Sequence, residues 1–258
     1  MNFNEIVEII ESIASHELTA DWDNSGVQIY TGTKEVKSIL VALEVTSDVI
    51  KEAADKKVDL IITHHPLFFS PLYSINNDVA IGRFTIELIQ AGISVYSVHT
   101  NFDETNGGNN DYLAYMLKLN NVRKFGDGAI GTLGELLRPV AFGDFCKFTK
   151  ETLKLNCINT VGAPLTLIKN IGICSGAGSG REMIDNAFFL GCDLYITGDV
   201  KYHDAQYALE KGICLIDAGH YGTEKFFAEN MIKQLKNAAI VDVEIISSKI
   251  NADPFSYL

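Results

Sequence analysis

The chain has 258 residues, 47% of them hydrophobic and 21% charged, so it is long enough for one large domain or two of ordinary size. Its formal net charge is -12 and its pI about 4.9, which argues against a nucleic-acid partner, because duplex-binding proteins usually present a basic face. No apolar run approaches the roughly 20 residues that a membrane-spanning helix requires, so we expect no membrane partner either.

The N-terminal segment and the cysteines indicate where the protein works. Residues 1–18 carry Glu5, Glu8 and Glu11 where a secretory signal needs basic residues, and isoleucines recur there at helical spacing. The five cysteines are scattered and never spaced as Cys-x-x-Cys, which argues against disulfides and against a structural zinc site. We therefore expect an N-terminal amphipathic helix, reduced thiols and a cytoplasmic location.

Short apolar runs then alternate with helical patterns. Three strands and two helices are predicted in alternation, over residues 38–43, 47–54, 58–63, 81–90 and 93–98. Thr46 or Ser47 is positioned to cap the first of these helices. Continuous apolar strands separated by crossover helices are typical of a mainly parallel α/β sheet with both faces covered.

The second part of the chain repeats this order. Lys57–Thr63 resembles Gly191–Thr197, 134 residues later, and Ala91–Tyr96 resembles Lys211–Ile216. One interpretation is that any two strand-helix-strand units look alike. The other predicts two similar, mainly parallel-sheet α/β halves that face a central metal cleft. These would be residues 1–124 and 125–258, with a boundary placed loosely near Val122 to Asp127.

Residues of the types that bind metals follow three predicted strands, in Thr63–Pro66, Val98–Asp103 and Asp217–Glu224. Ligands of open α/β sheets bind beyond the carboxyl ends of the strands, so these segments should converge. Adjacent residues of an extended chain point in opposite directions, and the pair His64 and His65 therefore suits two metals better than one. Glu224 follows His220 by four residues and shares its helix face, where a carboxylate can bridge two ions. The predicted ligands are His64, His65, Asp103, His220 and Glu224.

Several further residues are candidates for roles around this constellation. His99 is expected to act as a catalytic or hydrogen-bonding group beside the ligands. The loop Cys174–Gly180 is either a phosphate-binding turn or, as the commoner explanation, a plain glycine turn. Asp199 and His203 are expected to contact the substrate or a ligand. A last group, expected to line the entrance of the site, is Trp22, Asp23 and Asn24.

Six blocks of sequence carry a resemblance to a known family. They are ADWDNSGVQI (20–29), ITHHPLFF (62–69), VHTNFDE (98–104), ITGDVKYHDA (196–205), DAGHYGTE (217–224) and ADPF (252–255). Together and in this order they resemble the NIF-three-like family, whose members are often labelled GTP cyclohydrolase type 2 homologues. The blocks cover nearly the whole chain, and its length resembles the short form of the family.

The resemblance implies a dinuclear metal site on the five ligand positions above, two similar α/β halves and a ring-shaped homo-oligomer, commonly a hexamer. We pair His65 with Asp103 on one ion and His64 with His220 on the other, with Glu224 as the bridge. Three imidazoles and two carboxylates without a thiolate suit two divalent ions of Zn, Fe, Mn or Ni.

These ions, with Glu224 and His99 as catalytic residues, predict a metal-dependent hydrolase. Its substrate would be a nucleotide-like or other phosphate-bearing or heterocyclic small molecule. Two alternatives come from other classes: a metal storage or delivery protein, and an interaction scaffold without turnover.

Overall fold

The computed structural model describes residues 1–126, 128, 130–238 and 240–256. The chain forms two compact units. Unit 1 comprises Met1–Thr105 and Phe226–Pro254, and unit 2 comprises Asn106–Lys225 with the described residues after Pro254. Among the described residues, no helix is both long and apolar enough to span a membrane.

This division differs from the expected boundary at residues 124 and 125. The stretch expected to link two halves instead joins two strands of unit 2, β5 (Asn120–Phe125) and β6 (Gly131–Ala141), which pair antiparallel. Asp127, within the expected boundary, lies outside the described residues. The chain then returns to unit 1 at residue 226, because its last strand completes the sheet there.

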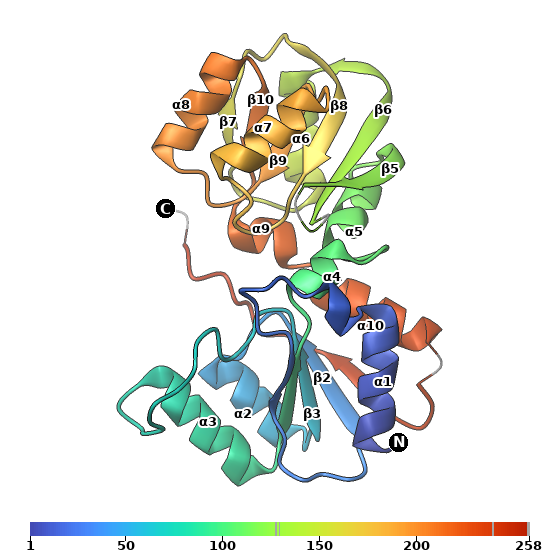
Figure 1. The fold of residues 1–258 in the computed structure, drawn as a ribbon, viewed down its shortest axis with the longest axis vertical. Helices are drawn as coiled ribbons and strands as arrows, with labels where there is room; N and C mark the ends of the chain where they lie inside the picture. The colour runs from blue at the N-terminus through green and yellow to red at the C-terminus, as the bar shows by residue number, and fades with distance from the viewer. Residues whose placement is uncertain (127, 129, 239, 257–258) are drawn as a thin grey trace. The chain divides into compact units, whose positions relative to one another are not determined.

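Unit 1 is a five-stranded sheet covered by helices on both faces (Figure 1). Its elements are α1 (Phe3–Ile13), η1 (His16–Leu18), β1 (Gly26–Ile29), β2 (Ser38–Ala42), α2 (Ser47–Asp55), β3 (Leu60–Thr63), α3 (Ala80–Ala91), β4 (Ser94–Ser97), α4 (Thr100–Glu104), α10 (Phe227–Asn237) and β11 (Glu244–Ser247). The strand order is β1-β4-β3-β2-β11, and only β1 runs antiparallel to its neighbour. The predicted parallel sheet is confirmed here.

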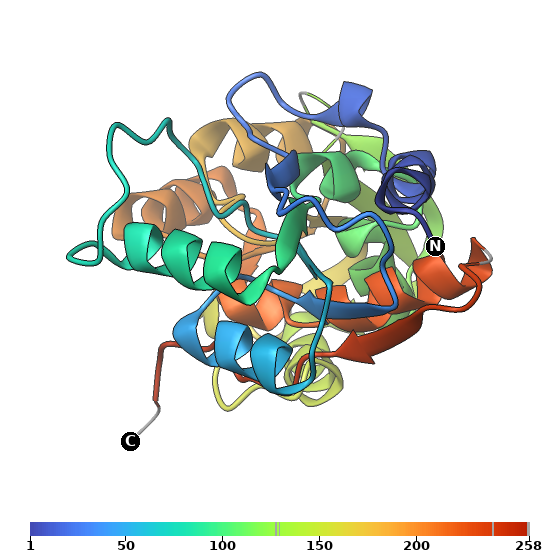
Figure 2. The same ribbon diagram turned by 90° about the horizontal axis from the view of Figure 1, so that it is seen from below.

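Alternation of side chains along the buried strands explains the two covered faces. Leu60 and Ile62 of β3 pack with α1 and α10, whereas Ile61 packs with α2 and α3. The last two helices, light blue and teal, lie side by side in Figure 2. Thr46 caps α2 by accepting a hydrogen bond from the backbone N–H of Val49, as the sequence indicated.

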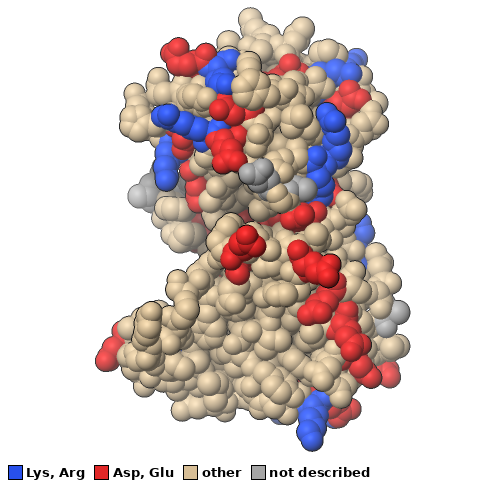
Figure 3. Space-filling model, viewed as in Figure 1, with Lys and Arg blue, Asp and Glu red and all other residues tan. Residues whose placement is uncertain are grey.

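Helix α1 is amphipathic, as its spacing predicted. Ile6 and Ile10 are fully buried, and Asn2 and Glu5 form a capping box at its start. Its glutamates point to solvent and contribute to the row of acidic side chains over α1 in Figure 3. All five cysteines are unpaired, which agrees with the expectation of free thiols.

Unit 2 contains a six-stranded sheet of mixed direction, in the order β5-β6-β8-β9-β10-β7. Its other elements are α5 (Asn109–Met116), α6 (Phe142–Thr152), β7 (Asn159–Val161), β8 (Leu167–Ile173), α7 (Arg181–Phe189), β9 (Leu194–Thr197), α8 (Tyr202–Lys211), β10 (Cys214–Asp217) and α9 (His220–Glu224). Strands β8, β9 and β10 are parallel, but β5, β6 and β7 add antiparallel pairs on both sides. The second sheet is therefore less parallel than the sequence suggested.

The internal repeat is visible in the elements themselves. Helix α2 and strand β3 recur 134 residues later as α7 and β9 (Ser47 to Arg181, Leu60 to Leu194). One device is also repeated: Asp59 accepts backbone hydrogen bonds from Lys37 and Ser38 at the start of β2, and Asp193 does the same for residues 169 and 170 of β8. Related positions thus do the same structural work in both units.

Candidate metal centre

The histidine pair of unit 1 lies directly after β3. Both backbone N–H groups, of His64 and His65, donate to the carbonyl oxygen of Leu43, at 3.1 and 3.0 Å. The chain bends here, and the two ring centroids are only 5.2 Å apart. The prediction that these side chains point in opposite directions is wrong, because it assumed an extended strand where the chain has already turned.

His64 is prepared to bind a metal through one particular nitrogen. Its side chain is fully buried, and its Nδ1 lies 2.8 Å from the carbonyl oxygen of Val98. A carbonyl oxygen only accepts, so Nδ1 carries the proton and Nε2 carries the lone pair. Nε2 lies 3.7 Å from Oδ2 of Asp103, a carboxylate that α4 buries. Two of the predicted ligands therefore converge in unit 1.

His99 joins this group through a residue whose role the sequence did not reveal. Asp23 is buried rather than part of an open entrance, and its Oδ1 accepts a 2.8 Å hydrogen bond from Nδ1 of His99. Its other oxygen accepts from the hydroxyls of Ser25 and Thr100. Burial alone would raise the pKa of Asp23, but the hydrogen bonds from His99 and Thr100 outweigh it and hold that pKa well below its usual range.

The three imidazoles form one cluster. Nitrogen atoms of His64, His65 and His99 all lie within 4.8 Å of one another, close enough to hold a metal ion. The rings of Trp22 and Phe69 stand edge-on to His99, with centroids 5.9 and 5.6 Å away. Unit 1 thus offers a nitrogen-rich site with one carboxylate beside it and aromatic side chains around it.

Unit 2 supplies the remaining two predicted ligands from α9. Nε2 of His220 lies 3.1 Å from Oε2 of Glu224, one helical turn away, and the carboxylate is buried. Nδ1 of the same ring lies 2.7 Å from Oδ2 of Asp199. The Glu224 hydrogen bond, the largest contribution, together with Asp199 raises the pKa of His220 from 6.5 to about 9, although burial opposes the shift.

Glycines bring the loops of unit 2 close enough for this arrangement. A Cβ on Gly176, whose φ is +67°, would lie 2.2 Å from Oε1 of Glu224. A Cβ on Gly198 would lie 2.6 Å from the backbone nitrogen of His220. Only glycine permits such approach between backbone and site, so these two residues shape the position of both ligands.

The loop Cys174–Gly180 supports the glycine-turn interpretation over a phosphate site. The N–H of Ser175 donates to Oδ1 of Asn110 at 2.7 Å, and the N–H of Gly176 donates to Oγ1 of Thr223 at 2.9 Å. Amide groups that would hold a phosphate are therefore already engaged. The loop's value lies in the missing side chains that the alternation of glycines provides.

Two other candidates have different outcomes. Asp199 takes the predicted place beside a ligand, in the left-handed conformation with φ of +54°, which aspartate tolerates better than most residues. His203 is exposed on α8, where its ring contacts Tyr202, and the structure gives it no printed bond to His220 or Glu224 within the described part of unit 2. The order of residues alone could not separate these two cases.

Two repeated α/β units, with histidine and carboxylate groups gathered after their strands, define a candidate metal-binding protein of the open-sheet class. The family Duf34/NIF3 (NGG1p interacting factor 3) matches residues 1–254, and the chain belongs to this family. A GTP cyclohydrolase 1 type 2 homolog of Clostridium perfringens is 36% identical over 100% of both chains.

Two further comparisons agree. A GTP cyclohydrolase 1 type 2 of Helicobacter pylori is 36% identical over 87% of each chain. The solved structure of a Bacillus cereus protein related to NIF3 covers 100% of this chain and 99% of its own, with a TM-score of 0.91 and 25% identity. The resemblance inferred from the six sequence blocks is thereby confirmed.

Proposed function

We propose that the chain is a dinuclear metal-binding protein that works as a metal-dependent hydrolase. The observation that carries this proposal is the convergence of three imidazoles, those of His64, His65 and His99, within 4.8 Å. Burying polar rings together is costly unless they have partners, and a metal ion is the partner that three nitrogens share. Membership of a family whose relatives carry the cyclohydrolase name supports the reaction class.

The donor atoms fit divalent transition metals. Imidazole nitrogens and carboxylates suit Zn, Fe, Mn or Ni, and the proposed set of ligands contains no thiolate. His64 and His99 each direct Nδ1 to a protein oxygen, which fixes the ring and leaves Nε2 for a metal. The proposed ligands of two ions are His64, His65, Asp103, His220 and Glu224.

The side chains have separable tasks in this proposal. Two bound divalent ions would lower the pKa of a water molecule and polarise the substrate. Glu224 would balance their charge, since it is the buried carboxylate of α9, and His99 would hold or pass a proton at Nε2. The substrate would be a nucleotide-like, phosphate-bearing or heterocyclic small molecule, and GTP is the first to test because a relative bears its name.

Glu224→Gln separates an enzyme from a metal reservoir. The change keeps size and hydrogen-bonding capacity but removes the charge, so hydrolysis of GTP or another nucleotide should fall by about 10²-fold or more. Elemental analysis and turnover should be measured on the same preparations. A reservoir would lose metal and have no turnover in the unaltered protein.

The matched control is Glu182→Gln, an exposed glutamate in the first turn of α7 in the same unit. It should leave both metal content and turnover unchanged. If Glu224→Gln also leaves both unchanged, then Glu224 is not a ligand, and the two-ion site is wrong. Complete absence of metal after reconstitution of the unaltered protein would reject the proposal as a whole.

We also propose a homo-oligomer, commonly a hexamer in this family, on the resemblance alone. The expected observation is a mass several times that of the 28.4 kDa chain in light scattering at micromolar concentration. A monomeric mass would contradict it. This test is independent of metal content and of turnover.

A further inference from the structure

A large concave pocket lies in unit 1 beside the histidine cluster. Its volume is about 860 Å³. Its walls come from residues 22–31 around β1, from the loop of residues 68–75, and from α3 with Gly92 after it. Pockets for small organic ligands typically measure roughly 300 to 1,000 Å³, so this one has the capacity for a ligand of drug size.

The pocket and the histidine cluster share walls. Asp23 lines the pocket and also accepts the hydrogen bond from Nδ1 of His99. Trp22 and Phe69 line it as well, and their rings are the ones that stand edge-on to His99. A ligand in the pocket therefore lies against the residues that surround one of the three imidazoles.

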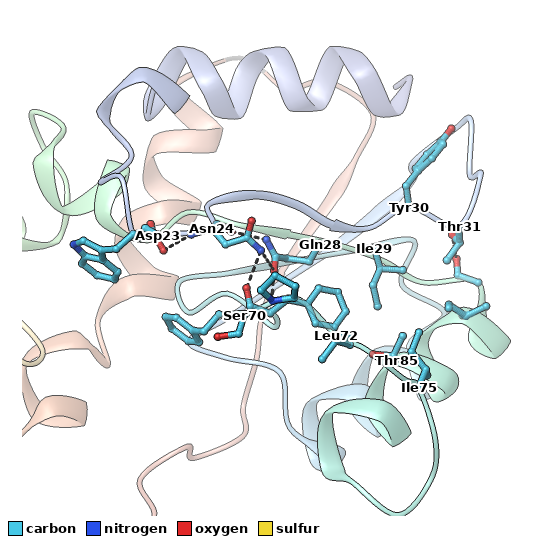
Figure 4. A pocket seen from close by; sticks show the side chains of 16 residues that line it. Asp23, Asn24, Gln28, Ile29, Tyr30, Thr31, Ser70, Leu72, Ile75 and Thr85 are labelled. Carbon is cyan, nitrogen blue, oxygen red and sulfur yellow. Dashed lines mark hydrogen bonds between the residues drawn. The ribbon is translucent and has the colours of Figure 1, made fainter.

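Hydrogen bonds hold the pocket in shape. The side-chain amide of Asn24 donates to the carbonyl oxygen of Phe68 at 2.7 Å, and Oε1 of Gln28 accepts from the N–H of Phe68 at 3.1 Å. Figure 4 shows Asn24, Gln28 and Ser70 together at this bonded part, with Leu72, Ile75 and Thr85 farther along towards α3. The aromatic loop is thus tied to the segment before β1 without any ligand.

The lining is apolar and carries little charge. Among the described residues that line the pocket, Asp23 is the only one that is charged at neutral pH, and it is already bonded to His99. Exposed fractions are 65% for Trp22, 53% for Tyr30, 53% for Phe69 and 52% for Ile75. Large apolar side chains gathered at a concave surface indicate a binding site, and the absence of lysine and arginine there disfavours a phosphate group.

We propose that this pocket binds an uncharged, flat aromatic group of the small molecule on which the histidine cluster acts. Trp22 and Phe69 supply rings against which a planar group stacks, while Leu72 and Ile75 exclude water from its far edge. The proposal deepens the proposed function, since it names the part of the substrate that is recognised and assigns any charged part to a place outside the pocket.

The test uses metal-free full-length protein and three matched probes. 2-Naphthamide is flat and uncharged, 2-naphthoate has the same rings with a negative charge, and decalin-2-carboxamide has the same amide on a saturated frame. Calorimetry should show 2-naphthamide binding about tenfold more tightly than either of the others, because a buried charge and a lost stacking contact both cost affinity. Trp22 is the only tryptophan of the chain, so a change in its fluorescence locates the probe.

Two pocket variants and one control make the site specific. Phe69→Ala and Ile75→Asp should each weaken 2-naphthamide binding by about five- to tenfold, through lost stacking and an added charge. Leu165→Asp, an equally drastic change at an 87% exposed residue of unit 2, should leave it unchanged. Thermal unfolding of each variant shows whether it is folded before binding is compared.

Three outcomes would overturn the proposal: no binding of 2-naphthamide, equal binding of all three probes, or equal binding by both pocket variants. If no probe binds and Ile75→Asp lowers the mass of an assembly in light scattering, the apolar surface covers a second copy of the chain instead. Because the protein is metal-free, a failure here leaves the metal proposal standing. Failure of metal binding with intact probe binding would reject only the proposed function.

Discussion

Units 1 and 2 share a plan of strands and helices but carry different chemistry after corresponding strands. Strand β3 is followed by His64 and His65, whereas its counterpart β9 is followed by Gly198 and Asp199. The helices α4 and α9 also correspond, 120 residues apart from Thr100 to His220. Metal-ligand chemistry therefore depends on a few residues at strand ends, which can differ while the surrounding fold stays the same.

The two sites also hold their histidines in different ways. In unit 1 a neutral carbonyl oxygen orients His64, and a fully buried carboxylate orients His99. In unit 2 His220 lies between two carboxylates, one of them half-exposed. A metal entering unit 2 must therefore displace a proton, because the pKa of His220 is raised to about 9.

Removal of a ligand from either unit should have the largest effect. His64→Ala and His220→Ala should each lower the metal bound per chain from as many as two ions, and by more than the roughly 10- to 100-fold affinity loss typical of outer-shell changes. His203→Ala is the matched control, since His203 is an exposed histidine of unit 2. Elemental analysis after dialysis decides; a metal content equal to that of the control would remove the residue from the ligand set.

The carboxylates that orient the histidines should differ in importance. Asp23→Asn should weaken metal binding by about 10- to 100-fold, because Asp23 is fully buried and bonds three neighbours. Asp199→Asn should cost less, because its side chain is 53% exposed and water can take its place. Competition with a chelator measures both affinities, and a larger loss for Asp199→Asn would reverse the comparison between the units.

Gly176→Ala should be a smaller disturbance that is specific to unit 2. Its Cβ would displace Glu224, whereas Gly212→Ala has the same left-handed strain, φ +79°, with no atom within 4 Å. The strain alone costs about 1 to 2 kcal/mol of unfolding free energy. Gly176→Ala should exceed the control in unfolding and should lower metal affinity, while Gly212→Ala leaves affinity intact. Equal affinities would show that Glu224 tolerates the displacement.

Periodicity and strand-end position were enough to predict much of the molecule. The strands before His64 and His99, the cap at Thr46 and the repeat at 134 residues all follow from local patterns that burial and hydrogen bonding enforce. The ligand candidates were found because their residue types occur directly after those strands. The gathering of His64, His65 and His99 was not predicted as a set.

Other features depend on contacts that sequence order does not encode. The bend after β3 turns His65 back beside His64, and no local signal distinguishes it from an extended strand end. Asp23 was expected at an entrance but bonds His99, 76 residues away. Return of the chain to unit 1 follows from pairing of β11 with β2, a long-range choice between equally apolar edges.

The smallest expected effect is a pH dependence confined to unit 2. In the metal-free folded protein the pKa of His220 is about 9, above its ordinary value of 6.5, mainly because Glu224 accepts its hydrogen bond. The folded state therefore binds this proton more tightly than the unfolded state does, so its stabilising contribution is complete below about pH 6.5 and disappears as the pH rises through about 9. Unfolding free energy from urea titrations should fall across this window, and only slightly, because the side chain is 36% exposed and solvent screens the pair. Glu224→Gln should flatten the decline, whereas Glu182→Gln should preserve it. A steeper decline in Glu224→Gln would show that a group outside this pair, and therefore a different part of the molecule, controls the titration.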